Sequence, residues 1–241
     1  MRLNVYLAKI NKEDMTARED ELVGKVSSWR REKILKMKNP SVRAESLAAG
    51  MVLRYALEHE LAEKLNTEVT FEYDIEEGVQ GKPFIKELRC FDKSSGEALD
   101  APALEFNISH SGKYVAAVAG KGPLGLDVET KSDKDLKVTK RMFSEPEKER
   151  VIGAKDPDSE FRTVWTEKEA YLKCTGEGIS VSLKSFYKNE DTAEVMRDNS
   201  GEFAGTGYYV YTVKPGEDTL SLAVCSKDKN ITLDIINVID L

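Results

Sequence analysis

The sequence has few of the residues and segments that build disulfide frameworks, zinc sites or membrane spans. Its three cysteines are odd in number, widely separated and outside any Cys-x-x-Cys spacing, so they predict neither a disulfide framework nor a metal site. The longest wholly apolar run, Tyr114 to Ala119, is far shorter than the roughly 20 residues that cross a bilayer. The N-terminus does not have the layout of a signal peptide. We therefore expect a soluble cytoplasmic protein without a membrane partner.

A basic excess is also missing. The chain of 241 residues has 36 Lys+Arg against 43 Asp+Glu, which gives a net charge of -7. Nucleic acids and anionic lipids attract chains with a positive field, so we expect neither as a partner. Hydrophobic residues make up 40% of the chain, which is enough to build a packed core.

Three common catalytic fingerprints are absent: the Gly-x-Ser-x-Gly elbow, the P-loop and the Gly-x-Gly-x-x-Gly dinucleotide motif. Only two histidines are present, His59 and His110. Ser109 and His110 are consecutive on a predicted strand, so they point to opposite faces and cannot pair directly as nucleophile and base. Beside the hydroxyls of its turn, His110 could hold a phosphate, and a structural histidine is the alternative.

Hydrophobic periodicity predicts a chain organised as two similar parts. Helical spacing covers Thr16 to Lys38 and Ser46 to Leu65, between strand-like segments. Beyond the break at Lys121 to Pro123 the order of strand, helices and antiparallel strands begins again. We predict an α+β fold of two pseudo-symmetric halves, residues 1–122 and 123–241, each an antiparallel sheet packed with helices.

Two acidic residues lie on one predicted strand, Leu-Gly-Leu-Asp-Val-Glu. Asp127 and Glu129 are two residues apart, so both side chains point to the same face. Their repulsion in that small space is about 3 to 4 kcal/mol at an effective dielectric near 20, and a divalent cation would remove it. A solvated strand face is the alternative interpretation.

A third carboxylate lies beside the apolar stripe of a predicted helix from about Glu160 to Cys174. At about 100° per residue, Glu169 lies only about 40° from Trp165, and Lys173 follows one turn later. The same geometry predicts that Glu167 points to solvent. With Asp127 and Glu129, Glu169 would complete an oxygen-rich site that suits Mg²⁺. A surface pair of Glu169 and Lys173 is the alternative.

One segment reverses the acidic character of the chain. Residues 25–43 carry seven basic residues and one acidic residue. Arg30 and Lys33 lie one turn apart on one helix face, a spacing that can chelate a phosphate, although a basic solvated face would look the same. Lys82, in Gly81-Lys82-Pro83, adds another potential phosphate contact. We expect an anionic ligand at these residues.

Five short motifs occur together between about residue 25 and residue 180. They are Gly81-Lys82-Pro83, Phe106–Ser111, Gly125–Glu129, Phe143-Ser144 with Glu147, and Trp165–Lys173. In their order and spacing these motifs resemble those of the Sfp-type 4'-phosphopantetheinyl transferases. The predicted layout in two halves is similar to the pseudo-symmetric monomer of that family.

The resemblance implies an enzyme that transfers the 4'-phosphopantetheine arm of coenzyme A to a serine of an apo acyl or peptidyl carrier protein. Adenosine 3',5'-bisphosphate is released, and coenzyme A lies in the cleft between the halves. Mg²⁺ is the implied cofactor, with Asp127, Glu129 and Glu169 as its ligands. Lys173 is implied to assist the leaving group, and either Glu147 or Glu169 to act as base.

The same resemblance implies that the N-terminal half binds the nucleotide. The implied contacts are Arg30, Lys33, Arg43, Lys82, Pro83, Ser109 and His110. One position departs from the family pattern, because Glu45 stands where members usually carry a basic residue before the Ser46-Leu47 pair. Arg43, two residues earlier, is the candidate substitute.

The implied partner is an acidic carrier protein, which the basic residues Lys137, Lys140, Arg141 and Lys148 would attract. A solvated helix face would explain this basic run equally well. We expect a monomer, because one chain supplies both halves. Two other functions remain open from the residues alone: a Mg²⁺-dependent hydrolase or transferase acting on another nucleotide diphosphate, and a non-catalytic module that binds carrier proteins.

Overall fold

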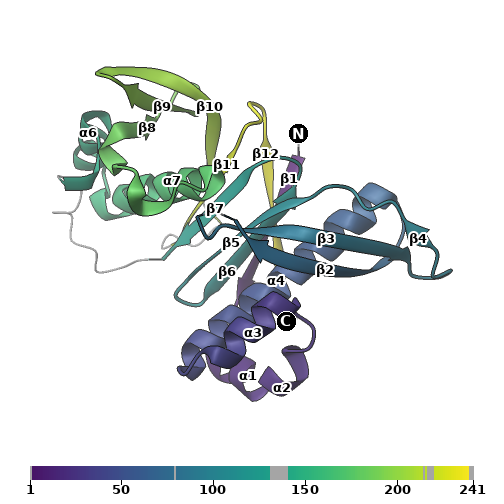
Figure 1. The fold of residues 1–241 in the computed structure, drawn as a ribbon. Coiled ribbons are helices and arrows are strands. Elements are labelled where there is room, and N and C mark those ends of the chain that lie inside the picture. Colours follow the sequence, from purple (N-terminus) through teal and green to yellow (C-terminus); the bar gives the residue numbers. More distant parts are fainter. Residues whose placement is uncertain (1, 79, 131–140, 214, 216–219, 239–241) are drawn as a thin grey trace. The chain divides into compact units, whose positions relative to one another are not determined.

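A computed structural model describes residues 2–78, 80–130, 141–213, 215 and 220–238 (Figure 1). The chain divides into two compact units. Of the described residues, the first unit contains Leu3–Gly122 and those from Asp234 to Val238, and the second contains Arg2 and Pro123–Leu233. None of the helices in the described ranges combines the length and the apolar character needed to cross a bilayer.

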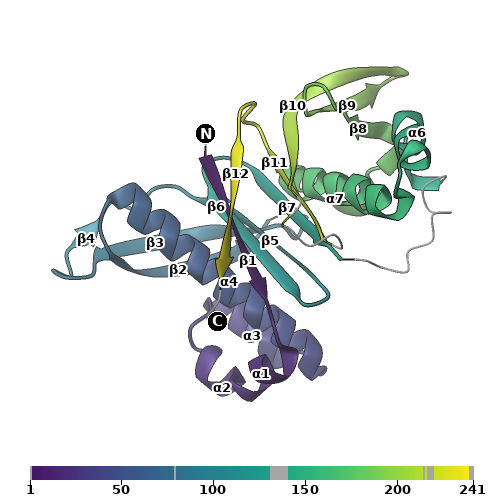
Figure 2. The ribbon, with the colours of Figure 1, turned by 180° about the vertical axis from the view of Figure 1, so that it is seen from behind.

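The first unit is built on a four-stranded sheet in the order β12-β1-β6-β5. Its strands are β1 (Arg2–Lys9), β5 (Glu105–Ser111), β6 (Tyr114–Gly120) and β12 (Thr232–Val238). β6 pairs antiparallel with both β1 and β5, and Figure 2 shows β12 beside β1. β12 therefore belongs to the sheet of the first unit, although it lies near the C-terminus. The predicted halves, residues 1–122 and 123–241, would have placed this strand in the second unit.

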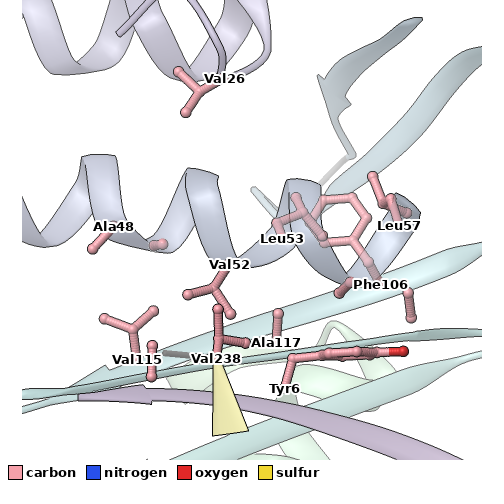
Figure 3. Packing of buried hydrophobic residues seen from close by; sticks show 14 of the residues in the cluster. Tyr6, Val26, Ala48, Val52, Leu53, Leu57, Phe106, Val115, Ala117 and Val238 are labelled. Atoms are coloured by element: carbon pink, nitrogen blue, oxygen red, sulfur yellow. The ribbon is translucent and has the colours of Figure 1, made fainter. Parts of the chain in front are cut away.

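A long helix, α4 (Pro40–Leu65), packs against this sheet and closes the core. Val52 and Leu57 of α4 are fully buried, as are Tyr6, Val115 and Ala117 of the sheet (Figure 3). Each large apolar side chain buried in this way contributes about 1.5 to 3 kcal/mol relative to exposure. The apolar residues at helical spacing on α4 and the face of β6 that carries Val115 and Ala117 therefore meet in one core.

The helix predicted over Thr16 to Lys38 is divided into three shorter helices. They are α1 (Lys12–Ala17), α2 (Glu19–Leu22) and α3 (Ser28–Lys36). Arg18 departs from helical geometry between α1 and α2, with φ -101° and ψ 9°. Ser27 is extended and caps α3, accepting a hydrogen bond from the Arg30 amide at 3.3 Å. Capping by Ser27 offers the backbone an alternative to a continuous helix, which periodicity alone does not show.

The first unit also carries a three-stranded sheet in the order β2-β3-β4. Its strands are β2 (Val69–Glu77), β3 (Pro83–Asp92) and β4 (Ala98–Leu99). In the turn between β2 and β3, Gly81 has a φ of +79°, which glycine adopts without the strain that a Cβ would cause. Lys82 and Pro83 therefore lie where this turn enters β3.

The second unit is a five-stranded sheet, in the order β7-β11-β10-β9-β8, with helices packed on it. Its strands are β7 (Leu124–Glu129), β8 (Phe186–Lys188), β9 (Glu194–Asn199), β10 (Glu202–Val213) and β11 (Ser221–Ser226). Its helices are α6 (Glu145–Gly153), α7 (Pro157–Thr175) and the short 3₁₀ turns η1 (Gly178–Ser180) and η2 (Leu183–Ser185). All pairings given for this sheet are antiparallel. The predicted α+β class, with antiparallel sheets and packed helices, is confirmed.

Candidate active site

The acidic strand β7 lies directly against α7. A Cβ added to Gly125 would stand 2.0 Å from the carbonyl oxygen of Ala170 and 2.5 Å from the amide nitrogen of Cys174, so only glycine allows this approach. Gly125, Asp127 and Glu129 share one face of β7 because strand residues alternate. The close approach at Gly125 therefore directs the face that bears both carboxylates toward α7.

Asp127 contacts α7 through Lys173. The Lys173 ammonium donates a hydrogen bond to Asp127 Oδ1 at 2.7 Å, and Asp127 is only 5% exposed. Burial strengthens this pair relative to a surface ion pair, because less water screens it. Glu129, at the end of β7, is half-buried and lies opposite Ser221 of β11. The hydrogen bond from Lys173 therefore joins α7 to the acidic strand β7.

Glu169 lies one turn before Lys173 on the same helix. Residues four apart are separated by about 40° around the axis, so Glu169 and Lys173 project from the same side of α7. Glu169 is half-buried, as the stripe-edge prediction requires. Asp127 and Glu129 of β7 and Glu169 of α7 are carboxylates, and carboxylate oxygens are the hard donors that Mg²⁺ prefers.

The prediction that Glu167 points to solvent is wrong. Glu167 is 3% exposed and accepts hydrogen bonds from Lys188, Thr212 and Arg150, each at 2.8 Å. Burial by itself would raise the pKa of Glu167, but the charges of Lys188 and Arg150 outweigh it and lower the pKa. Glu167 is therefore a buried anion that ties α7 to neighbouring elements.

The next residue, Lys168, is buried as well. Its ammonium lies 2.7 Å from Glu147 Oε1 and donates to the carbonyls of Leu183 at 2.7 Å and Phe186 at 2.6 Å. These contacts give each of the three ammonium hydrogens an acceptor. Lys168 therefore joins α7 to α6 and to the segment that enters β8.

Glu147, one of the two predicted bases, is engaged through both oxygens. Its Oε2 accepts hydrogen bonds from the Ser144 amide at 2.9 Å and the Ser144 hydroxyl at 2.7 Å, a capping-box arrangement at the start of α6. Its Oε1 faces Lys168. Burial raises the pKa of Glu147 and lowers the pKa of Lys168, because each charge loses water. These contacts give Glu147 a structural role at the α6–α7 junction.

In the first unit, Arg30 of α3 is the best-placed candidate for an anion. One of its terminal nitrogens donates to Ser46 Oγ of α4 at 3.4 Å, while its buried Nε finds no hydrogen-bond partner among the described residues. Burial lowers the pKa of Arg30, since desolvation disfavours the charged form. Lys33, one turn away, is paired with Glu77 of β2 and lies over the ring of Trp29.

The departure at Glu45 places a carboxylate beside two basic side chains. Glu45 pairs with Lys12 of α1, and its other oxygen lies 3.9 Å from His110 Nδ1. Arg43, the predicted substitute, is instead held by Glu19 at 3.0 Å and by the Met37 carbonyl at 3.4 Å.

Ser109 and His110 lie on opposite faces of β5, as predicted. Ser109 is 6% exposed, whereas His110 is largely exposed. Lys82 and Pro83 are half-buried at the β2–β3 turn. Two of the predicted nucleotide contacts thus approach consecutive residues of α4: His110 lies beside Glu45, and Arg30 donates to Ser46.

Two charged residues of these clusters were not identified from the sequence. Glu167 follows Thr163 by four residues and precedes Ala170 and Cys174 by three and seven, a spacing that places it on the buried face of α7. The angle of Glu167 from the stripe that contains Trp165 predicted a solvent position, because only one face of the helix was taken to be buried. Lys12 carried no signal, because its partner Glu45 is 33 residues away in the sequence.

Comparisons with known proteins agree with the motifs. A family model described as the 4'-phosphopantetheinyl transferase superfamily matches residues 123–225. A 4'-phosphopantetheinyl transferase of Bacillus subtilis is 29% identical over 189 residues, which is 76% of this chain and 75% of that protein. The transferase psf-1 of Bacillus pumilus is 30% identical over 190 residues, 77% of this chain and 72% of that protein.

The transferase Sfp of Bacillus subtilis strain 168 is 32% identical over 143 residues, 58% of this chain. The chain spans 62% of the length of Sfp. A solved structure, the Thermotoga maritima holo-[acyl-carrier-protein] synthase, aligns at 17% identity with a TM-score of 0.32, covering 43% of this chain and 61% of that one. The fold assignment does not depend on this partial match.

Proposed function

The chain belongs to the 4'-phosphopantetheinyl transferases, and from this membership we propose that Asp127, Glu129 and Glu169 form its Mg²⁺-binding catalytic centre. The enzyme transfers the 4'-phosphopantetheine arm of coenzyme A to a serine of an apo carrier protein and releases adenosine 3',5'-bisphosphate. The observation that carries the proposed site is the 2.7 Å contact between Lys173 and Asp127, which joins α7 to the acidic strand β7.

The donor set fits Mg²⁺. Asp127 and Glu129 share the face of β7 that meets α7, and Glu169 lies one turn from the lysine that touches Asp127. Carboxylate oxygens are the ligands that a small hard cation takes, together with water and substrate phosphates. When bound there, Mg²⁺ would neutralise charge that grows on the pyrophosphate of coenzyme A.

The protein's own groups move the proton and stabilise the leaving group. We assign Glu169 as the base that accepts the proton of the carrier serine while the serine oxygen forms a bond to the β-phosphorus. The bond from that phosphorus to the bridging oxygen breaks, and the Lys173 ammonium donates a hydrogen bond to the departing phosphate. Glu147 is the weaker candidate for the base, because Ser144 and Lys168 hold both of its oxygens.

We assign the nucleotide end of coenzyme A to the first unit. Arg30 supports this assignment, because a buried guanidinium with an unpartnered Nε gains most from a phosphate. Lys33, Lys82 with Pro83, Ser109 and His110 complete the proposed set of contacts. Arg43 is left out, since Glu19 and the Met37 carbonyl already hold its guanidinium.

An acidic carrier protein is the proposed partner, and we propose that the enzyme acts as a monomer. Arg141 and Lys148 are the described members of the basic run expected to attract it, and Lys148 pairs with Glu145. Lys137 and Lys140 lie outside the described residues. Electrostatic attraction of this kind raises the association rate more than the final affinity.

Mass spectrometry of an apo carrier protein incubated with coenzyme A and Mg²⁺ tests the function. The expected result is a carrier heavier by the phosphopantetheine arm, together with free adenosine 3',5'-bisphosphate. An intact carrier with hydrolysed nucleotide would favour a hydrolase, and binding without reaction would favour a carrier-binding module. Either result would overturn the proposal.

Variants test the proposed centre. Asp127→Ala and Glu169→Gln are each expected to reduce the transfer rate by at least about a hundredfold, the usual effect of losing a metal ligand or a general base. The control is Asp158→Asn, which changes an exposed carboxylate in the first turn of α7, the helix that carries Glu169. This variant should retain the wild-type rate. Undiminished transfer by Asp127→Ala would refute the site.

A further inference from the structure

Glu45 meets two basic side chains from other elements, those of Lys12 and His110. Glu45 lies in the second turn of α4, Lys12 begins α1, and His110 lies near the end of β5. Glu45 accepts a hydrogen bond from Lys12, and its second oxygen is 3.9 Å from His110 Nδ1. The side chain of Lys12 is 35% exposed and that of His110 is 52% exposed, so a ligand in solution can reach both.

The neighbouring residue on α4 adds a third basic group. Ser46 accepts a hydrogen bond from Arg30, whose Nε has no partner among the described residues. Lys12, His110 and Arg30 therefore gather around two consecutive residues of α4. Within this cluster Glu45 is the acidic member, and it uses one of its oxygens to hold the lysine.

We propose that Lys12 is a substrate-binding residue, whose ammonium leaves Glu45 to bind a phosphate of coenzyme A. The inference rests on the proposed function and adds a residue from α1 to the nucleotide contacts. The ion pair of Lys12 and Glu45 is partly exposed, and ion pairs that water reaches contribute little to stability, so little opposes the exchange. A phosphate with two negative charges is a stronger partner for the ammonium than one carboxylate.

Glu45 then acts against substrate binding. It competes for Lys12, and its carboxylate lies beside the histidine assigned to the same ligand. A phosphate bound at that histidine would lie near the Glu45 carboxylate, and the two negative charges would repel each other, more strongly where water is partly excluded. The two partners of this ion pair are therefore expected to affect coenzyme A binding in opposite directions.

Opposite shifts of KM for coenzyme A in the Lys12 and Glu45 variants distinguish this role from a structural ion pair. Lys12→Met is expected to raise KM for coenzyme A about tenfold with kcat unchanged, the effect of losing one charge-assisted contact. Glu45→Gln is expected to lower the same KM about threefold, because it removes repulsion and frees Lys12. A purely structural pair would instead shift KM in the same direction in both variants, or in neither.

The matched control is Lys36→Met, which removes another exposed lysine that is paired with a glutamate, Glu32, at 3.8 Å. It should leave KM for coenzyme A unchanged, and KM for the carrier protein should be unchanged in all three variants. Equal KM values for Lys12→Met and Lys36→Met would overturn the inference. An equal rise in KM for the carrier would do so as well.

Calorimetry with adenosine 3',5'-bisphosphate separates this inference from the proposed function. Lys12→Met is expected to weaken binding of the bisphosphate, and Glu45→Gln to strengthen it, whether or not a carrier is modified. A wild-type protein that binds the bisphosphate but transfers nothing would refute the function alone. Unchanged binding in Lys12→Met would refute the role of Lys12 alone.

Discussion

The buried carboxylate of Glu167 offers the sharpest test of how α7 is held in place. Glu167→Gln keeps the shape of the side chain and removes its charge. The charges of Arg150 and Lys188, which lie 2.8 Å from Glu167 in the native protein, would then have lost their most buried partner. Since α7 carries Glu169 and Lys173, loosening this anchor would also disturb the proposed centre.

The expected loss follows from burial. Removing one member of a buried ion pair destabilises a protein by about 3 to 5 kcal/mol, because the remaining charge is left uncompensated. Arg150 retains Glu160 and Glu190, and Lys188 retains Glu190, so we expect the lower end of that range, about 3 kcal/mol. At a slope of about 3 kcal/mol per molar, the urea midpoint would fall by about 1 M.

Glu190→Gln is the matched control. Glu190 contacts the same two cations, Arg150 and Lys188, but its side chain is 51% exposed. An exposed pair contributes about 0 to 1 kcal/mol, so this variant should lose at most about 1 kcal/mol. Equal losses from Glu167→Gln and Glu190→Gln would refute the reasoning, because burial would then not set the energy.

Tryptophan fluorescence during urea unfolding can follow the second unit separately. The chain has two tryptophans, Trp29 in the first unit and Trp165 in the second. In a Trp29→Phe background the signal comes from Trp165, which lies half a turn from Glu167 on α7.

The loss of stability in Glu167→Gln depends on pH in a defined direction. The pKa of Glu167 is lowered from its usual value of 4.5, since the charges of Lys188 and Arg150 outweigh the opposing effect of burial. Its contribution to stability is therefore fully present above 4.5 and is lost as pH falls through the lowered native pKa. The difference between wild type and Glu167→Gln should be constant near neutral pH and should shrink under strongly acidic conditions.

Three further outcomes follow from the second unit. Gly125→Ala should lower the free energy of unfolding of the second unit by about 3 kcal/mol, because the added Cβ would meet the Ala170 carbonyl oxygen at 2.0 Å. An unchanged melting temperature would contradict the close approach of α7 to β7. Lys168→Met should lower the free energy of unfolding in urea by about 3 to 5 kcal/mol, because Glu147 and two backbone carbonyls lose a buried donor. A loss below about 1 kcal/mol would contradict the stabilising role of Lys168. Removal of divalent cations with EDTA should abolish transfer and added Mg²⁺ should restore it, while full activity in EDTA would refute the metal centre.

Local spacing was sufficient for much of the fold. The helix predicted from Ser46 to Leu65 lies within α4, and the helix predicted from about Glu160 to Cys174 lies within α7. Both carry apolar residues at helical intervals, and that pattern is read without knowing any distant contact. The helix predicted from Thr16 to Lys38 was wrong in its continuity, because the cap at Ser27 and the backbone of Arg18 interrupt it.

In the candidate site, too, spacing within one element predicted some features and not others. The two-residue spacing of Asp127 and Glu129 placed both carboxylates on one strand face, and the four-residue spacing of Glu169 and Lys173 placed both on one helix side. The contact between Lys173 and Asp127 joins residues 46 apart in the sequence, and no spacing within a single element predicts it. The resemblance implied Glu147 or Glu169 as the base, and only the structure shows that Ser144 and Lys168 contact both oxygens of Glu147.

By itself, the sequence determined the class of fold, the family and the faces on which Asp127, Glu129 and Glu169 lie, because these depend on short motifs and on spacing within single elements. Only the tertiary structure decided which charges are paired. Glu167 is buried because Thr212, 45 residues away, and two basic side chains surround it, and Glu45 is joined to Lys12 across 33 residues. Burial and long-range pairing set the energy of a charge, and neither is a property of a short segment.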